Sequence, residues 1–284
     1  MLSSEAKENG RKYRSLLFVW NHANFPFREA KMTPDDYMLL TVSRHSPPTG
    51  LQSPVHEVRA QLQRPIKSWA KRYLLDIRFS GSYAKCTRVI GCTDADLLIS
   101  LGPRTPGTMK QIYKNFFAYL AVKNYGPRQQ NISIGITYSG LKIDLIPAKK
   151  HWGSTNNLSL FEVERQREIQ TNIDTHISLV RQSHRLDEIK ATKIWHNLRH
   201  LRFPSFYLEL TVLNALRSSE ENQPAANILT VLEYLRDKFI SSRVSDPANS
   251  NNIISDDLML HERMAISRAA ADSLKESDWG KIIW

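Results

Sequence analysis

Apolar residues near the start of the chain recur at helical spacing, and turn-forming residues separate them into two segments. Thr33-Pro34 and Ser53-Pro54 are each typical of a helix start, because a hydroxyl can cap the first turn and proline fits within it. The second segment carries an apolar stripe at Val55, Val58, Leu62, Ile66, Trp69 and Tyr73. Its outer side carries Arg59, Arg64, Lys67, Lys71 and Arg72. We therefore expect two helices, of which the second is long, amphipathic and kinked at Pro65.

The pattern then changes to apolar runs rich in β-branched residues, which predict strands. The expected strands cover residues 75–79, 95–101, 131–138 and 141–146. A helix is expected between about residues 109 and 125, where apolar residues return to helical spacing. Ser139 and Gly140, between the last two strands, are typical of a tight turn that joins paired strands.

From about residue 171 onward the pattern is helical. Helices are expected at residues 185–199, 204–217, 225–239 and 257–273, with a long polar loop at 242–255. The pattern thus predicts an α/β first half and an all-helical second half. We divide the chain into an N-terminal extension at 1–31, a core at 32–165 that includes the long helix, and the helical lobe at 166–284. The extension lacks clear periodicity, and Met32 is an alternative start of the protein.

The composition is that of a folded globular protein, with 41% hydrophobic and 24% charged residues among 284. The apolar run at residues 16–20 is much shorter than a signal-peptide core or a membrane span. We therefore expect a cytoplasmic protein that does not use a membrane. The net charge of +11 indicates a surface that attracts polyanions, which include nucleic acid, nucleotide triphosphates and anionic lipid, without choosing among them.

The most distinctive chemistry lies in a short segment after the first expected strand. Gly81 has no Cβ, so its backbone can approach a phosphate closely, and Ser82 adds a hydroxyl beside the free N–H groups of an expected helix start. Asp94 and Asp96 lie two positions apart at the start of the next apolar strand, so both carboxylates project from one face. The segment thus combines an anion-binding turn with two neighbouring carboxylates.

A third carboxylate, Asp144, lies in another apolar strand, on the face opposite Ile143 and Leu145. Carboxylates this close repel one another unless a cation lies between them, and oxygen ligands beside substrate phosphates suit Mg²⁺. Asp94, Asp96 and Asp144 on one open face match a phosphoryl-transfer site that holds two metal ions. We expect these to be Mg²⁺, with Mn²⁺ as an alternative.

Each part of this pattern also has an ordinary explanation. An Asp-X-Asp sequence is common, and a lone Gly-Ser pair is a turn far more often than a phosphate-binding loop. The basic helix fits a solvated amphipathic helix without any ligand. The order of the parts, with a third acidic residue inside an apolar strand, favours the catalytic interpretation.

These motifs resemble the DNA polymerase β-like nucleotidyltransferases, in which Gly-Ser precedes an Asp-X-Asp strand and a later Asp strand. More narrowly, the chain resembles the bacterial cGAS/DncV-like nucleotidyltransferases (CD-NTases), which make cyclic di- and trinucleotide signals in antiphage systems. The resemblance runs from about residue 35 to the end of the chain. It is carried by Gly81-Ser82-Tyr83-Ala84-Lys85, Thr93-Asp94-Ala95-Asp96-Leu97, Ile143-Asp144-Leu145-Ile146-Pro147-Ala148-Lys149, Thr171-Asn172-Ile173-Asp174-Thr175-His176, Phe203-Pro204-Ser205-Phe206-Tyr207-Leu208-Glu209-Leu210 and Asp246-Pro247-Ala248-Asn249.

The resemblance implies an α+β fold, with a mixed sheet, a helical C-terminal lobe and a cleft between them. It also implies roles for individual residues. Metal binding and catalysis go to Asp94, Asp96 and Asp144, and nucleotide binding goes to Gly81, Ser82, Lys85, Lys193, Ser205 and Phe206. Lys193 and Ser205 would bind the donor triphosphate, and Phe206 or Tyr207 would stack on a base. For Ser205 the local pattern agrees, because a hydroxyl just after Pro204 lies where the helix dipole favours anions. Lys193 fits a cleft or a solvated surface, and the two aromatic residues fit a core equally well.

The two cysteines mark departures from the family pattern. Cys86 and Cys92 match neither a disulfide framework nor a zinc site. Relatives commonly carry glycine at both positions, so the fine geometry of this loop, and with it substrate preference, can differ here. The ordinary interpretation of each cysteine is a small buried apolar residue.

The resemblance implies an enzyme that builds cyclic di- or trinucleotides from ATP, with GTP as a further candidate substrate, for bacterial antiphage signalling. It also implies a HORMA-domain protein as a candidate regulatory partner. Two other hypotheses stay open. A template-independent RNA-tailing or linear oligoadenylate synthase would use the same three carboxylates, and a non-catalytic nucleic-acid-binding protein would use the basic helix.

Overall fold

Strands β1 to β7 form one mixed sheet in the described part of the chain, which comprises residues 32–47, 50, 53–91, 95–153 and 156–284 of a computed structural model. The sheet order is β1-β2-β5-β4-β3, and β6 pairs with the end of β5 and with β7. β2 and β5 are parallel, whereas the other neighbours are antiparallel. The strands are β1 Leu74–Ser80, β2 Ala95–Leu101, β3 Arg128–Gln129, β4 Ile134–Tyr138, β5 Leu141–Lys150, β6 Leu158–Glu162 and β7 Arg167–Thr171.

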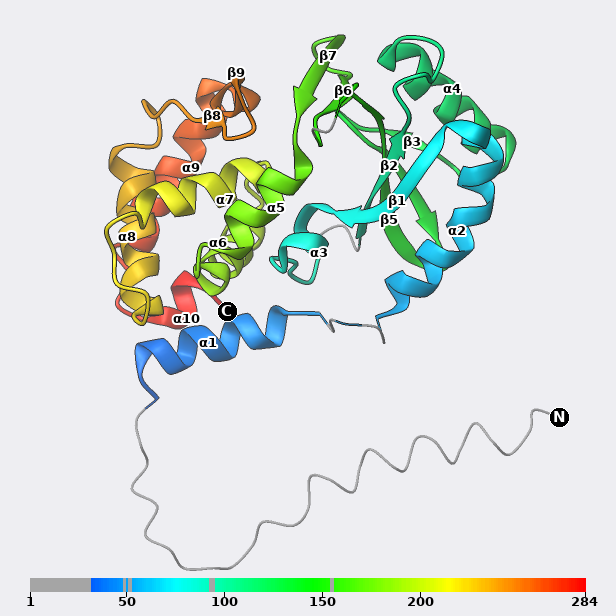
Figure 1. The fold of residues 1–284 in the computed structure, drawn as a ribbon. Coiled ribbons are helices and arrows are strands. Elements are labelled where there is room, and N and C mark those ends of the chain that lie inside the picture. Colours follow the sequence, from blue (N-terminus) through cyan, green and yellow to red (C-terminus); the bar gives the residue numbers. More distant parts are fainter. Residues whose placement is uncertain (1–31, 48–49, 51–52, 92–94, 154–155) are drawn as a thin grey trace, which may run out of the picture. The chain divides into compact units, whose positions relative to one another are not determined.

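Helices α2 (Pro54–Ala70) and α4 (Met109–Val122) pack on one face of this sheet (Figure 1). The stripe predicted for α2 is buried against the strands at Val55, Val58, Leu62 and Ile66. The helix continues through Pro65. A short 3₁₀ turn, η2 (Lys71–Tyr73), leads into β1, and α3 (Gly81–Lys85) follows β1 directly.

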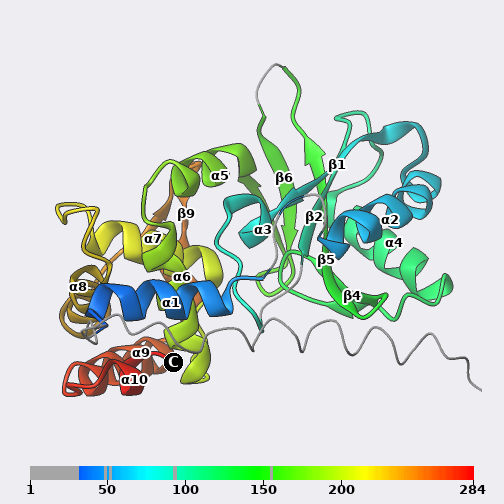
Figure 2. The same cartoon turned by 90° about the horizontal axis from the view of Figure 1, so that it is seen from below.

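The helices of the second half form a separate hydrophobic core together with α1 (Pro34–His45). Met38 and Val42 of α1 are buried in it, and Tyr37 Oη donates to the carbonyl of Ile283 at 3.0 Å, so α1 lies beside α10 (Figure 2). The remaining helices are α5 Ile173–Arg181, α6 Leu186–Leu198, α7 Ser205–Ala215, α8 Pro224–Asp237, α9 Leu260–Ser273 and α10 Trp279–Ile282. Residues Thr33–Trp284 form one compact unit, and the division of the chain at residue 165 stays a prediction.

Most of the expected elements are confirmed, including the α+β class. Thr33 caps α1 with a reciprocal capping box, whereas Ser53 precedes α2 without a side-chain capping bond. The strand expected at 131–138 begins only at residue 134, and the one expected at 141–146 extends to 150. Ser139 and Gly140 both have positive φ, as the predicted tight turn requires.

The polar segment at 242–255 was wrongly expected to be a loop, and the second half is not all-helical. This polar segment contains a hairpin of β8 (Ser245–Asp246) and β9 (Asn249–Ile253), which η3 (Ile254–Asp257) follows. The side chains of Asn249 and Asn252 donate to the carbonyl of Gln170 in β7, so a distant strand holds the hairpin in place. Local periodicity could not reveal this, because asparagine disfavours strands.

Strands β6 and β7 were also missing from the sequence prediction. No helix among the described residues is both long enough and apolar enough to cross a membrane.

Candidate active site

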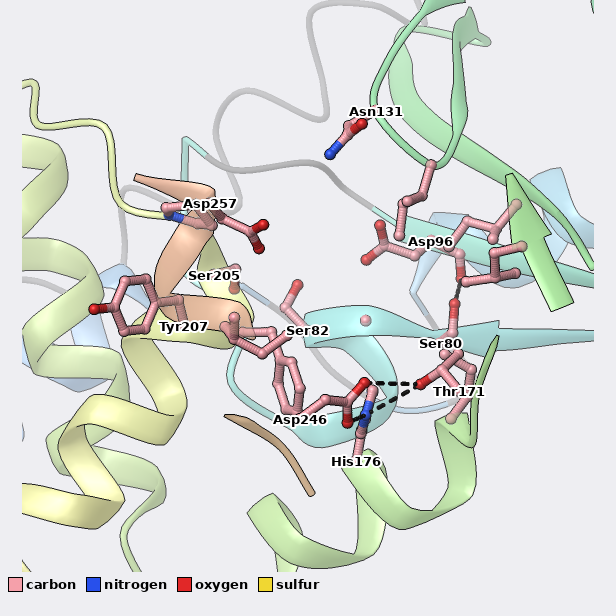
Figure 3. Close-up of a pocket in the computed structure, with 18 of the residues that line it drawn as sticks. Ser80, Ser82, Asp96, Asn131, Thr171, His176, Ser205, Tyr207, Asp246 and Asp257 are labelled. Atoms are coloured by element: carbon pink, nitrogen blue, oxygen red, sulfur yellow. Dashed lines mark hydrogen bonds and ion pairs between the residues drawn. The ribbon is translucent and has the colours of Figure 1, made fainter. Parts of the chain in front are cut away.

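A cavity of about 610 Å³ opens between the sheet and the helices of the second half (Figure 3). This volume lies within the range of small-molecule binding sites. Its wall includes every described residue to which the sequence assigned a metal, catalytic or nucleotide-binding role, namely Gly81, Ser82, Lys85, Asp96, Asp144, Lys193, Ser205 and Phe206. Residues from five elements, α3, β2, β5, α6 and α7, therefore meet at one cavity.

Asp96 and Asp144 face each other across the one parallel strand pair of the described sheet. They are direct partners in the register of β2 and β5, while their neighbours Ala95 and Ile143 point into the opposite core. In Figure 3 the carboxylate of Asp96 points into the cavity. Burial, followed by the negative charge of Asp144, raises the pKa of Asp96 from 3.8 to about 6, against the opposing influence of nearby lysines.

Gly81 makes the position of Asp96 sterically feasible. Its φ is +53°, and a Cβ at this position would overlap the carboxylate of Asp96. The backbone N–H of Ser82 donates to the same carboxylate, so α3 begins directly against it. The absence of a Cβ at Gly81 was predicted to let a phosphate approach the backbone. Its close contact with Asp96 is a second reason for glycine at this position.

Asp94 and Cys92 lie outside the described residues. Among the described residues, no three His, Cys, Asp or Glu side chains converge as a metal site. The described pair, Asp96 and Asp144, nevertheless fits a hard divalent cation. The two carboxylates lie on adjacent strands, the charge of Asp144 helps to raise the pKa of Asp96, and positive charge between them would relieve that repulsion.

A buried ion network lies behind the cavity. Glu209 of α7 is completely buried and bonds Lys85 from α3 and Lys193 from α6, the latter at 2.6 Å. Thr87 donates to Glu209 at 2.7 Å and accepts from Lys193 at 2.9 Å. Burial alone would raise the pKa of Glu209, but the two lysines hold it at about 2.

This network revises the picture of Lys193, because its side chain is 2% exposed and is not a solvated surface lysine. Lys85 and Lys193 also bring positive charge towards Asp96. Sequence reasoning missed Glu209, although an acidic residue between Leu208 and Leu210 in an apolar helix was a visible signal.

The two aromatic residues of α7 have different surroundings. Tyr207 is fully buried in the helical core, and its hydroxyl points away from the cavity (Figure 3). Phe206 lies at the cavity, where its ring is 4.1 Å from that of His176 and 4.7 Å from the ammonium of Lys85. Tyr207 is thus a core residue, and Phe206 is the one positioned to meet a ligand. Ser205, the first residue of α7, also lines the cavity.

A histidine–carboxylate pair on the cavity wall was not assigned a role from the sequence. His176 Nε2 lies 2.6 Å from Asp246 Oδ1, and Thr171 donates to the other oxygen of Asp246 (Figure 3). The pair links α5 to β8. Asp174, which belongs to the same motif as His176, bonds Arg78 of β1 at 2.6 Å and so connects α5 to the sheet.

A second group of charged residues spans the cavity at the β6–β7 turn. Buried Glu162 bonds Arg165 and Arg167, each at 2.5 Å, and Arg165 also reaches Asp257 of η3 at 3.1 Å. Burial raises the pKa of Asp257. No sequence motif indicated this group, since Glu162, Arg165 and Arg167 come from β6, β7 and the turn between them, which the periodicity did not predict.

The sheet carries one carboxylate on each of two adjacent parallel strands, beside a Gly-Ser helix start, and faces a helical second half. This is the polymerase β-like nucleotidyltransferase fold. No family model and no curated protein matches the chain.

Solved structures similar to this chain include three CD-NTase proteins. CdnC of E. coli MS115-1 with ATP has a TM-score of 0.65 and 19% identity, covering 83% of this chain and 90% of that one. The same protein in a complex titled CdnC:HORMA-deltaN has a TM-score of 0.68 and 18% identity, covering 84% and 89%. Bradyrhizobium diazoefficiens CdnG with GTP has a TM-score of 0.70 and 14% identity, covering 86% and 91%.

The third protein is the CdnE cyclic dinucleotide synthase of Elizabethkingia meningoseptica with GTP and Apcpp. Its TM-score is 0.60 and its identity 13%, covering 85% of this chain and 99% of that one. The likeness extends over nearly the whole of each of these chains. It establishes that this chain has the CD-NTase fold.

Proposed function

We propose that this protein is a metal-dependent nucleotidyltransferase that joins nucleotides from ATP, and from GTP as a second substrate, into cyclic di- or trinucleotides. The observation that carries the proposal is the arrangement around Asp96 inside one cavity: Asp96 pairs with Asp144 in the register of adjacent strands and lies against the Gly81-Ser82 helix start. This combination supplies carboxylates for cations beside backbone N–H groups for phosphate.

In the proposed reaction, Asp94, Asp96 and Asp144 would hold two Mg²⁺ ions, for which Mn²⁺ could substitute. When bound, such ions would supply Lewis-acid activation of the attacking hydroxyl and charge neutralisation for the leaving pyrophosphate. The residues of the chain position the substrate. Ser82 and Ser205 each lie at the start of a helix, where a hydroxyl and the helix dipole favour a triphosphate.

The lysines and the aromatic residue of the cavity complete the donor site in this proposal. Lys193 and Lys85 contribute positive charge to the triphosphate from beside Glu209. Phe206 offers a ring to the donor base at the cavity wall. Because the cavity extends beyond these residues to Asn131 and Asp257, it has room for an acceptor nucleotide as well.

The similar structures support the proposed product and partner, and the family resemblance supports the proposed setting; none of the three is argued from the geometry of the site. Among the similar structures, CdnE is a cyclic dinucleotide synthase, CdnC contains ATP, and CdnG contains GTP. We extend the proposal to cytoplasmic antiphage signalling, which the family resemblance implies. A HORMA-domain protein is the proposed regulator, since CdnC forms a complex with one.

The test is to incubate the purified protein with the four nucleoside triphosphates and Mg²⁺, treat the mixture with phosphatase, and weigh the surviving products. A phosphatase-resistant cyclic species is expected. Asp96→Asn should abolish it, whereas Asp76→Asn, which changes an exposed carboxylate of neighbouring β1, should not. The experiment is repeated with a HORMA-domain protein, because the enzyme alone can be inactive.

Other outcomes would identify the alternatives. Label transferred only to added RNA would indicate a tailing enzyme. Salt-sensitive binding of duplex DNA or RNA without nucleotide turnover would indicate a non-catalytic binding protein.

A further inference from the structure

The side chain of Gln130 bonds directly to one of the assigned metal ligands. Its Nε2 donates to Asp144 Oδ1 at 2.9 Å. Gln130 comes just after β3, in the turn that precedes β4, and neither element was assigned a role by sequence or similarity. A neutral amide that holds an active-site carboxylate can fix the direction in which that carboxylate presents its oxygens.

The orientation of the amide is determined by its two partners. An ionised carboxylate only accepts hydrogen bonds, so the NH₂ group must face Asp144. The hydroxyl of Ser133 can donate, and it does so to Gln130 Oε1 on the other side. The amide of Gln130 is therefore held at both ends.

The turn that carries Gln130 is itself anchored in the core. The hydroxyl of Tyr113, a buried residue of α4, donates to the carbonyl of Ser133 at 2.7 Å and to that of Gln130 at 3.1 Å. The backbone N–H of Gln130 donates to the carbonyl of Ser133 at 3.1 Å. Because the backbone and the side chain are both fixed, Gln130 reaches Asp144 from a rigid support.

Gly135 supplies an independent sign that this contact is built into the fold. It is the β4 partner of Asp144, and a Cβ there would come within 2.7 Å of Gln130 Nε2 and 3.3 Å of Asp144 Oδ1. Gly135 does not have a positive φ, so its backbone conformation does not require glycine. What glycine provides is room for the amide beside the carboxylate.

We propose that Gln130 is a positioning residue that fixes Asp144 for binding a divalent cation. The inference rests on the proposed metal-dependent function. Gln130 acts through Asp144 and does not itself touch the substrate. Removing the amide while keeping the length of the side chain should therefore weaken cation binding more than it weakens nucleotide binding or folding.

The test compares Gln130→Met with Gln129→Met, a matched change at the preceding, exposed residue. Mn²⁺ affinity is measured by electron paramagnetic resonance in the full-length protein, with Asp96→Asn showing which signal belongs to this site. Gln130→Met should raise the Kd for Mn²⁺ by about 10-fold, the lower end of the effect of such supporting partners. Gln129→Met should leave it unchanged. Gly135→Ala, which crowds the same amide, should weaken Mn²⁺ binding in the same direction with Gln130 intact.

Turnover provides the second measurement. In Gln130→Met the Mg²⁺ concentration for half-maximal activity should rise by about 10-fold, while saturating Mg²⁺ restores most of kcat and the KM for ATP is little changed. Two results, each with unchanged Mn²⁺ affinity, would mean a purely structural role and overturn the inference. One is a loss of kcat at saturating Mg²⁺, and the other is a loss of thermal stability measured in EDTA. If wild-type protein binds Mn²⁺ through Asp96 but makes no product, the proposed function fails, while the Mn²⁺ comparison still decides the role of Gln130. If wild-type protein binds no Mn²⁺, both fail.

Discussion

In the metal-free protein at neutral pH, Asp96 should lower the free energy of unfolding. Replacing Asp96 with asparagine should restore it. The pKa of Asp96 is raised from 3.8 to about 6, first by burial and then by the charge of Asp144. At 1.36 kcal/mol for each pKa unit, the difference corresponds to about 3 kcal/mol. Because Asp96 lines a cavity that water can enter, we treat this as an upper value and expect about 1–3 kcal/mol.

The sign of the pH dependence follows from proton binding. Between about pH 4 and pH 6 the folded protein keeps a proton on Asp96 that the unfolded chain has released, so the free energy of unfolding falls as pH rises through this window. Above about pH 7 both states are ionised and the cost is constant. Asparagine at this position carries no such cost at any pH.

The assay is urea unfolding of wild type and Asp96→Asn in EDTA at pH 4.5, 6 and 8. These values sample the window of about pH 4 to 6, in which the cost of Asp96 grows, and the range above about pH 7, in which it is constant. The variant should be the more stable protein at pH 8, and its advantage should shrink towards pH 4.5. Saturating Mg²⁺ at pH 8 should stabilise wild type but not the variant. Asp76→Asn, at an exposed position, serves as the control. A variant that is less stable than wild type at pH 8 in EDTA, or an advantage that does not vary with pH, would refute this argument.

Three further predictions concern the surroundings of the cavity. Glu209→Gln leaves two buried lysines without their anion, so the free energy of unfolding should fall by about 3 kcal/mol or more at pH 7. Since the pKa of Glu209 is held at about 2 against an ordinary 4.5, this loss should diminish as pH falls from 4.5 towards 2, and an equal loss across that range would contradict the assigned ion network. Cys86 has φ +61° at the end of α3, so Cys86→Gly should raise the free energy of unfolding by about 1 kcal/mol in urea titration, and destabilisation would argue against the left-handed conformation. The buried hydroxyl of Tyr207 has no hydrogen-bond partner among the described residues, so Tyr207→Phe should be neutral or stabilising by up to about 1 kcal/mol. A large drop in melting temperature for Tyr207→Phe would reveal a partner of that hydroxyl.

The sequence predicted most of the elements and, within those, the faces on which their side chains lie. Alternation within β2 and β5 predicted that Asp96 and Asp144 point away from the buried side chains of Ala95 and Ile143, and this is confirmed. The Thr33 cap, the buried stripe of α2 and the turn at residues 139–140 were equally readable, because each depends on residues only a few positions apart.

Which of these faces meet depends on the packing of the whole chain. The parallel pairing of β2 with β5 makes Asp96 and Asp144 direct neighbours, although 48 positions separate them in the chain, and no local window contains that pairing. Glu209 likewise gains its partner Lys85 from 124 residues away.

The same reason explains the misses. The polar hairpin β8–β9 is held by hydrogen bonds from the side-chain amides of Asn249 and Asn252 to the backbone carbonyl of Gln170. Likewise, Gln130 can bond Asp144 because Gly135, the β4 partner of Asp144, leaves room for the amide. Periodicity encodes which side of an element is buried, whereas partners distant in sequence are selected by packing of the whole chain, which the order of residues in one segment does not contain.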